Sequence, residues 1–126
     1  MSKRVVAAYF AVENAMMSFI TRGIKEMRTV DKERIARHKR LKEWAKAVRE
    51  RDKMCIVCGA DKNIQAHHLL PKEFYHDKQF ELDNGVTLCS SHHKYNKYSA
   101  HKNALFFSEF LKTHRKEQYE KVIKWL

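Results

Sequence analysis

Two pairs of side chains with the chemistry of metal ligands mark the middle of this 126-residue chain. Cys55-x-x-Cys58 brings two thiolates within reach of one ion, and Cys89-x-x-His92 repeats the spacing with an imidazole in the last position. Gly59 directly follows the second cysteine and allows the backbone to turn tightly around the sulfur. Together the two pairs predict a tetrahedral structural zinc site. The alternative interpretation is three buried thiols and a surface histidine.

A second set of polar side chains lies between and directly after these pairs: His67, His68, Asn84 and His93. One structural metal ion would not use them all. Hydrolysis of a phosphodiester needs a base that deprotonates water, a cation on the phosphate and relief of charge on the leaving oxygen. Histidine suits the role of the base because its pKa lies near neutrality. The set therefore contains the residue types that such a reaction requires.

The elements that must position these residues are short. Residues 64–70 are predicted to form a strand closed by the only proline, Pro71, and residues 85–88 form a second strand after a turn at 83–85. Adjacent residues of a strand point to opposite faces, so His67 and His68 need not share a role. Ser90 or Ser91 is expected to begin a helix, which would carry His92, His93, Tyr95, Asn96 and Lys97.

Helical patterns flank this region on both sides. An apolar stripe at spacings of three and four predicts an amphipathic N-terminal helix that packs on the domain or on another copy; its members are Val5, Tyr9, Val12, Met16, Ile20, Ile24 and Met27. The pattern breaks near 28–31, where Thr29 or Asp31 could cap a second helix over residues 32–53. The apolar residues of 105–126 also have helical spacing, and we expect them to pack on the N-terminal helices.

Composition favours a mostly α fold around a small β-hairpin. Three glycines and one proline leave no linker rich in either residue, which predicts a single domain with a helical region at 1–53, a zinc-stapled finger at 54–100 and C-terminal helices at 101–126. Three cysteines, two of them in C-x-x-C, indicate metal binding in a reducing compartment, expected to be the cytoplasm. No apolar run approaches the roughly 18 residues that a membrane span requires.

The charge of the chain favours a polyanionic partner. The formal net charge is +11 and the pI is about 9.7. Residues 32–53 contribute much of the excess and are predicted to follow a phosphate backbone, with Arg37, Arg40 and Lys46 as contacts and Lys97 as a further one. A solvated, soluble surface is the simpler alternative, and an anionic membrane surface is a weaker third one.

The order of these motifs resembles the HNH endonucleases, whose core is a ββα-metal (His-Me) finger. The resemblance rests on C-x-x-C, His-His after a strand, and Asn84-Gly-x-x-Leu-Cys-x-x-His-His, and it covers about residues 44–100. It implies that His68 is the general base, that His67 and His93 bind a catalytic divalent cation and that Asn84 holds the base in line. Cys55, Cys58, Cys89 and His92 match the structural zinc set of many members. The implied products carry 5′-phosphate and 3′-hydroxyl ends, and the implied context is a phage or mobile element.

Two positions depart from the common pattern of the family. His67 stands where Asp is frequent, and His92 stands where the fourth zinc ligand is often Cys. Two imidazoles make the catalytic site tolerant of Mn²⁺, Ni²⁺ or Zn²⁺, with Mg²⁺ also open. His101 and Asn96, which follow His93, could add a contact to metal or phosphate.

Three classes of function remain. The leading one is a metal-dependent DNA endonuclease, expected to nick because one finger holds one base and one cation, with a homodimer through the N-terminal helix as the expected assembly. The second is a non-catalytic, zinc-stapled DNA-binding module, which accounts for the charge but not for the second polar set. The third is an interaction protein that assembles through the N-terminal stripe and uses zinc for folding alone.

Overall fold

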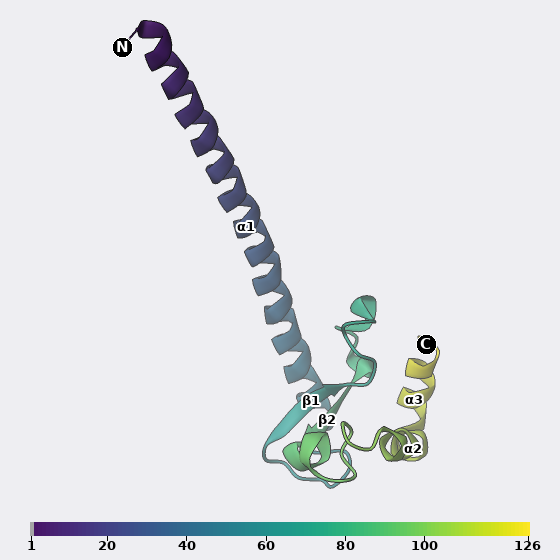
Figure 1. Ribbon diagram of the computed structural model, residues 1–126. Helices are drawn as coiled ribbons and strands as arrows, with labels where there is room; N and C mark the ends of the chain where they lie inside the picture. The colour runs from purple at the N-terminus through teal and green to yellow at the C-terminus, as the bar shows by residue number, and fades with distance from the viewer. Residues whose placement is uncertain (1) are drawn as a thin grey trace. The chain divides into compact units, whose positions relative to one another are not determined.

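A computed structural model describes residues 2–126, with the side chains of residues 24–27 outside the description. Its main elements are α1 (Lys3–Asp52), β1 (Ile64–His68), β2 (Gly85–Cys89), α2 (Ala104–His114) and α3 (Lys116–Ile123) (Figure 1). The protein is therefore mostly α with a small β-hairpin, as its composition predicts. It divides into two compact units, Met1–His38 and Lys39–Leu126. No helix in the described part of the chain is both long and apolar enough to cross a membrane.

The predicted helix break near 28–31, within the first unit, is wrong. α1 continues through this segment, which contains neither glycine nor proline. Asp31 pairs with Arg34 one turn later, with 3.2 Å between Oδ1 and Nη2. Residues such as Thr and Asp cost a helix interior only about 0.7 kcal/mol or less relative to Ala, so without a stronger breaker the helix persists.

The predicted apolar stripe lies exposed along α1. The exposed fraction is 53% for Val5, 59% for Val12, 60% for Met16 and 49% for Ile20. Phe19 does not belong to the predicted stripe but is 76% exposed, so the exposed apolar surface of the helix is wider than that stripe. Ile24 and Met27, the last two members of the predicted stripe, lie outside the described side chains.

The second unit is built around the antiparallel hairpin of β1 and β2. Its register pairs Ile64 with Cys89 at one end and His68 with Gly85 at the other. A zinc-ligand position therefore lies at one end of the hairpin and the predicted base at the opposite end. β1 ends at His68, before the predicted boundary at residue 70.

The helix predicted after β2 is much shorter than expected. It is a single π-helical turn, η3 (Ser91–Tyr95), which carries His92 and His93. Asn96 already has extended backbone angles, and its Oδ1 accepts a hydrogen bond from the amide of Tyr98 at 2.9 Å. Asn96 and Lys97 therefore lie outside the helix, contrary to the prediction.

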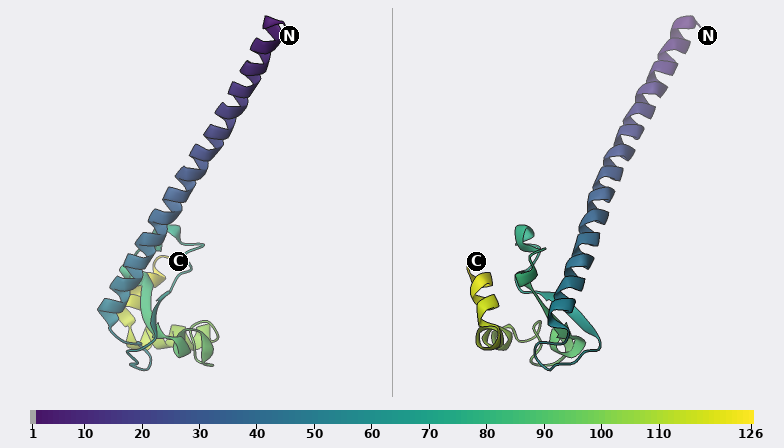
Figure 2. Two further views of the ribbon diagram at one scale, coloured as in Figure 1. Left: turned by 90° about the vertical axis from the view of Figure 1, so that its left-hand side faces the viewer. Right: turned by 180° about the vertical axis from the view of Figure 1, so that it is seen from behind.

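The C-terminal helices cover the hairpin. α2 and α3 pack against each other (Figure 2). Buried side chains of α2 join one core with the hairpin and the thiol cluster, and partly buried Tyr119 of α3 packs against it. The buried members of this core are Cys55, Val86, Leu88, Cys89, Ala100, Phe107 and Leu111. The expectation that these apolar residues pack on the N-terminal helices is therefore wrong, because both faces of β2 are buried and need apolar cover.

A buried carboxylate joins the end of α1 to the hairpin and to α3. The side chain of Asp52 is 1% exposed, and it pairs with Arg51 at 2.8 Å and with Arg115 at 3.1 Å. It also accepts a hydrogen bond from the amide of Thr87 at 2.9 Å. Burial tends to raise the pKa of Asp52, but the hydrogen bonds and the two guanidinium groups outweigh it and hold the pKa below its usual value. This network fixes residues 39–52 against the site.

Candidate metal centres and catalytic site

The four predicted zinc ligands converge in the structure. Cys58 Sγ and Cys89 Sγ are 3.7 Å apart, and His92 Nδ1 lies 3.3 Å from Cys89 Sγ and 4.0 Å from Cys55 Sγ. Ligand atoms that surround one tetrahedral zinc ion at about 2.0–2.3 Å are themselves about 3.3–3.8 Å apart. The soft, closed donor set therefore fits a zinc ion with little movement of the side chains.

The backbone around the first pair has the tight turn that the glycine allows. Gly59 has φ +76°, its amide donates to the carbonyl of Cys55 at 2.8 Å, and the amide of Cys55 donates to the carbonyl of Ala60 at 2.8 Å. Desolvation and the neighbouring sulfurs raise the pKa of Cys58 to about 11. Burial opposes ionisation of Cys55 too, but backbone amides led by that of Cys89 outweigh it and lower its pKa. Metal binding at this cluster would therefore release protons.

Three histidines form a second cluster: His67, His93 and His101. Nε2 of His93 lies 3.1 Å from Nε2 of His101, and the ring of His67 lies 5.1 Å from each of the other two rings, measured between centroids. Nδ1 of His93 lies 2.5 Å from Oε1 of Gln65. Because the amide oxygen accepts, Nδ1 carries the proton and Nε2 offers its lone pair to the centre of the cluster.

Burial and the neighbouring charges keep His67 and His93 neutral. Burial, followed by the neighbouring histidines, lowers the pKa of His67 to about 3. Burial, then His101 and Lys94, lowers the pKa of His93 to about 4. Neutral imidazoles are the form that binds a metal ion. The donor set therefore fits a divalent cation that accepts nitrogen ligands.

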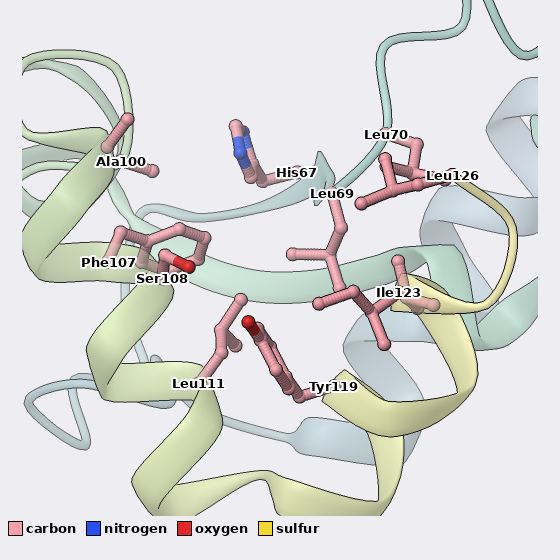
Figure 3. A pocket seen from close by; sticks show the side chains of 12 residues that line it. His67, Leu69, Leu70, Ala100, Phe107, Ser108, Leu111, Tyr119, Ile123 and Leu126 are labelled. Carbon is pink, nitrogen blue, oxygen red and sulfur yellow. The ribbon is translucent and has the colours of Figure 1, made fainter.

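His67 also lines an apolar cavity of about 270 Å³ (Figure 3). Phe107 and Leu111 of α2 and Tyr119 of α3 line this cavity, together with Leu69 directly after β1. The rings of Phe107 and His67 make a T-shaped contact, with an interplanar angle of 85° and a distance of 5.6 Å between the ring centroids. The apolar wall accounts for the strong desolvation of His67.

The predicted base, His68, is the last residue of β1 and lines one cavity with His67, His93 and His101. Its Nε2 lies 2.9 Å from the carbonyl oxygen of Gln79. A carbonyl only accepts, so Nε2 carries the proton and Nδ1 of the neutral ring keeps a free lone pair. The ring stacks on Trp44. Burial lowers the pKa of His68, the Gln79 carbonyl opposes this, and the charge of Lys72 adds to the lowering.

Asn84 is fully buried and fastens the loop between the strands. Its Oδ1 accepts from the amide of Leu70 at 2.7 Å, and its Nδ2 donates to the carbonyls of Leu70 at 3.3 Å and Lys78 at 3.1 Å. The last of these carbonyls immediately precedes Gln79, the partner of His68. Asn84 therefore reaches the predicted base through the loop backbone and not through a direct contact.

One part of the chain matches a known protein family. Residues 55–95 match the HNH endonuclease family. This HNH segment contains both cysteine pairs, both histidines of the His67-His68 pair, Asn84 and His93. The match supports nuclease activity in general, a nucleic-acid substrate and a divalent metal. Neither the search of curated proteins nor the search of solved structures gives a match.

Two residues at the site lie outside the HNH segment. Trp44 precedes it and His101 follows it. Sequence patterns assign no chemical role to Trp44, and they leave His101 as a candidate contact to metal or phosphate. Gln65, inside the segment, was overlooked, although it shares a face of β1 with His67 by the two-residue period of a strand. His101 has no such signal, because it lies in an irregular loop.

The predicted DNA contacts have different surroundings in the structure. Arg40 stacks on Phe80, with its Cζ 3.9 Å from the ring centroid. Lys46 is exposed and pairs with Glu50 at 3.7 Å, and Lys97 lies over the ring of Tyr98 at 4.9 Å. Arg37 belongs to the first unit, Met1–His38.

Proposed function

We propose that this protein is a metal-dependent DNA endonuclease that hydrolyses phosphodiester bonds, with His68 as the general base. The observation that carries the proposal is the pairing of Nε2 of His68 with the Gln79 carbonyl, which leaves Nδ1 free beside a separate three-histidine cluster. A structural zinc site alone uses neither feature. This supports an enzyme over a zinc-stapled binding module.

In this mechanism Nδ1 of His68 takes a proton from a water molecule. The water oxygen forms a bond to phosphorus, the bond from phosphorus to the 3′ oxygen breaks, and the 3′ oxygen takes a proton from solvent. The products carry a 5′-phosphate and a 3′-hydroxyl. A divalent cation, when bound, supplies positive charge to the phosphate and to the departing oxygen. Asn84 acts as a positioning residue, since it holds the loop that carries the Gln79 carbonyl.

We assign the catalytic cation to His67 and His93, and we add His101 as a third ligand. Three imidazoles favour Mn²⁺, Ni²⁺ or Zn²⁺ over Mg²⁺, which prefers oxygen ligands. Gln65 supports the assignment because it fixes the tautomer of His93. We assign structural Zn²⁺ to Cys55, Cys58, Cys89 and His92.

The partner is DNA, held by phosphate contacts along the basic part of α1. Arg37, Arg40 and Lys46 belong to this surface, and Lys97 adds a contact near the finger. The exposed apolar surface of residues 5–20 forms a homodimer through the N-terminal helix. An isolated helix does not leave this many large apolar side chains in water without a partner.

Cleavage of supercoiled plasmid tests the proposal. Chelated protein is supplied with one metal at a time, and wild type is compared with His68→Ala. Exposed His114 provides the matched control, as His114→Ala. We expect cleavage by wild type and by the control, and a loss of at least about 100-fold in His68→Ala. A His68→Ala protein that is folded, zinc-loaded and as active as wild type would remove this mechanism.

A further inference from the structure

A cavity of about 380 Å³ opens beside the three-histidine cluster. His67, His68, His93 and His101 line it together with Lys72 and Glu73. Lys72 is the only lysine or arginine among the lining residues. A phosphate that reaches both the base and the cation must enter this cavity, and it therefore meets the ammonium group of Lys72.

The backbone holds Lys72 firmly on both sides. On its N-terminal side, Leu70 donates to the buried Oδ1 of Asn84 at 2.7 Å. On its C-terminal side, the amides of Phe74 and Tyr75 both donate to the carbonyl of Pro71, at 3.1 and 3.0 Å. Lys72 thus lies in a closed turn whose start is fixed by a proline. Such a position fixes the backbone from which the Lys72 side chain reaches the cavity, so binding costs little backbone entropy.

No hydrogen bond or ion pair of the Lys72 ammonium is present among the residues that the structure describes. Some other lysines of the second unit, such as exposed Lys62, also have none among the described residues, whereas some have such partners: Lys78 pairs with Asp77, Lys102 donates to the carbonyl of Tyr95, and Lys121 pairs with Asp83. Lys72 is also partly withdrawn from water. A partly buried cation that makes no ion pair gains most from an anion that enters the cavity.

We propose that Lys72 is a catalytic residue that binds a non-bridging oxygen of the scissile phosphate. The inference rests on the nuclease activity proposed above. Its chemistry is electrostatic: negative charge increases on the phosphate oxygens as water attacks, and the Lys72 ammonium group stabilises that charge more strongly than the charge of the ground state. Neighbouring Glu73 provides the opposite charge in the same cavity and would repel the phosphate, so it does not serve this role.

The test compares Lys72→Ala, Lys72→Gln and Lys72→Arg with wild type and with Lys62→Ala, an exposed lysine before β1. Single-turnover cleavage is measured at saturating DNA with metal, and DNA binding is measured separately under chelation. We expect Lys72→Ala and Lys72→Gln to cleave about 10- to 100-fold more slowly, with binding changed about three-fold or less. Lys72→Arg should recover part of the rate, and Lys62→Ala should match wild type.

Two results would overturn the proposal. One is cleavage by both Lys72→Ala and Lys72→Gln within about two-fold of wild type, in folded protein with unchanged zinc content. The other is a Lys72→Arg protein that cleaves as slowly as Lys72→Ala, because the positive charge that arginine retains would then make no contribution to the rate. Both results leave the nuclease function of the wild type intact. An inactive wild type with every metal would instead refute the nuclease proposal and this inference with it.

Discussion

The indole of Trp44 stacks on the imidazole of His68, with ring centroids 3.8 Å apart and ring planes inclined by 10°. The indole is itself fixed, because its Nε1 donates to the carbonyl of Glu81 at 2.8 Å. A Cβ atom at Gly85 would collide with the indole and would lie 2.7 Å from Val48 Cγ2. Glycine at this position is therefore required by the close approach of α1 to β2, and the orientation of the predicted base depends on a residue far from it in sequence.

Loss of the indole should reduce both stability and cleavage. Trp44→Phe removes the hydrogen bond to Glu81 and should cost about 1 kcal/mol of unfolding free energy. Trp44→Ala also removes the stacked ring and should cost about 3–5 kcal/mol. Urea unfolding and plasmid cleavage at equal folded fraction measure the two effects, with Trp125→Phe as the control. A folded Trp44→Ala protein that cleaves at the wild-type rate would show that the stack does not position His68.

Cleavage should persist in mildly acidic solution. A general base works only when neutral, and the lowered pKa of His68 keeps it neutral below the usual histidine value of about 6.5. A cation bound nearby shifts that pKa in the same direction. The acid limb of kcat/KM against pH should therefore lie below 6.5, measured with metal at saturation at each pH. A limb above 6.5 would contradict the burial and the contacts of His68.

The two metal centres should separate in a chelation experiment. Mild chelation should abolish cleavage and leave one zinc per chain and the fold intact, because three imidazoles bind an exchangeable ion more weakly than three thiolates and an imidazole. Cys58→Ser should lose zinc and melt at a lower temperature. Zinc content, circular dichroism and cleavage after metal add-back are the measurements.

His101→Ala examines the assignment of the third ligand. It should raise the metal concentration for half-maximal cleavage by about ten-fold or more and leave the structural zinc and the melting temperature unchanged. An unchanged metal requirement in this variant would show that His67 and His93 bind the catalytic cation without His101.

DNA binding should weaken steeply with salt if the basic part of α1 contacts phosphates. Replacement of Arg37, Arg40 and Lys46 by alanine should reduce the slope of log affinity against log salt by about one per lost contact, with little change in sequence preference. A Lys112, Lys116 and Lys124 triple variant removes the same charge elsewhere and serves as the control. Equal slopes in the two triple variants would attribute the effect to net charge alone.

Plasmid cleavage should pass through the open-circular form. One finger holds one base, so each encounter cuts one strand. Val12→Lys with Met16→Lys should lower the association of the chains in sedimentation experiments without lowering the nicking rate, because the proposed dimer surface lies outside the HNH segment. Linear product from the earliest times, with no nicked intermediate, would instead show two sites acting together on both strands.

Local spacing in the sequence determined the features that depend on neighbouring residues. Cys55 and Cys58 lie within one turn, as do Cys89 and His92, so their ability to share an ion follows from backbone geometry over three residues. The strands around His67 and Val86 also follow from short patterns closed by Pro71 and by the turn before Gly85. The ends of elements were less certain: the finger helix stops at Tyr95 and α1 does not stop near Asp31.

Tertiary structure alone decided the contacts between distant or irregular segments. His101 joins His67 and His93 because the loop after η3 returns towards β1, and no periodic pattern encodes such a loop. Trp44 meets His68 because Asp52, Arg115 and Gly85 fix the end of α1 against the hairpin. The C-terminal apolar residues cover the hairpin because apolar burial is non-directional: the pattern predicts that a face is covered, and only the packed chain decides by what.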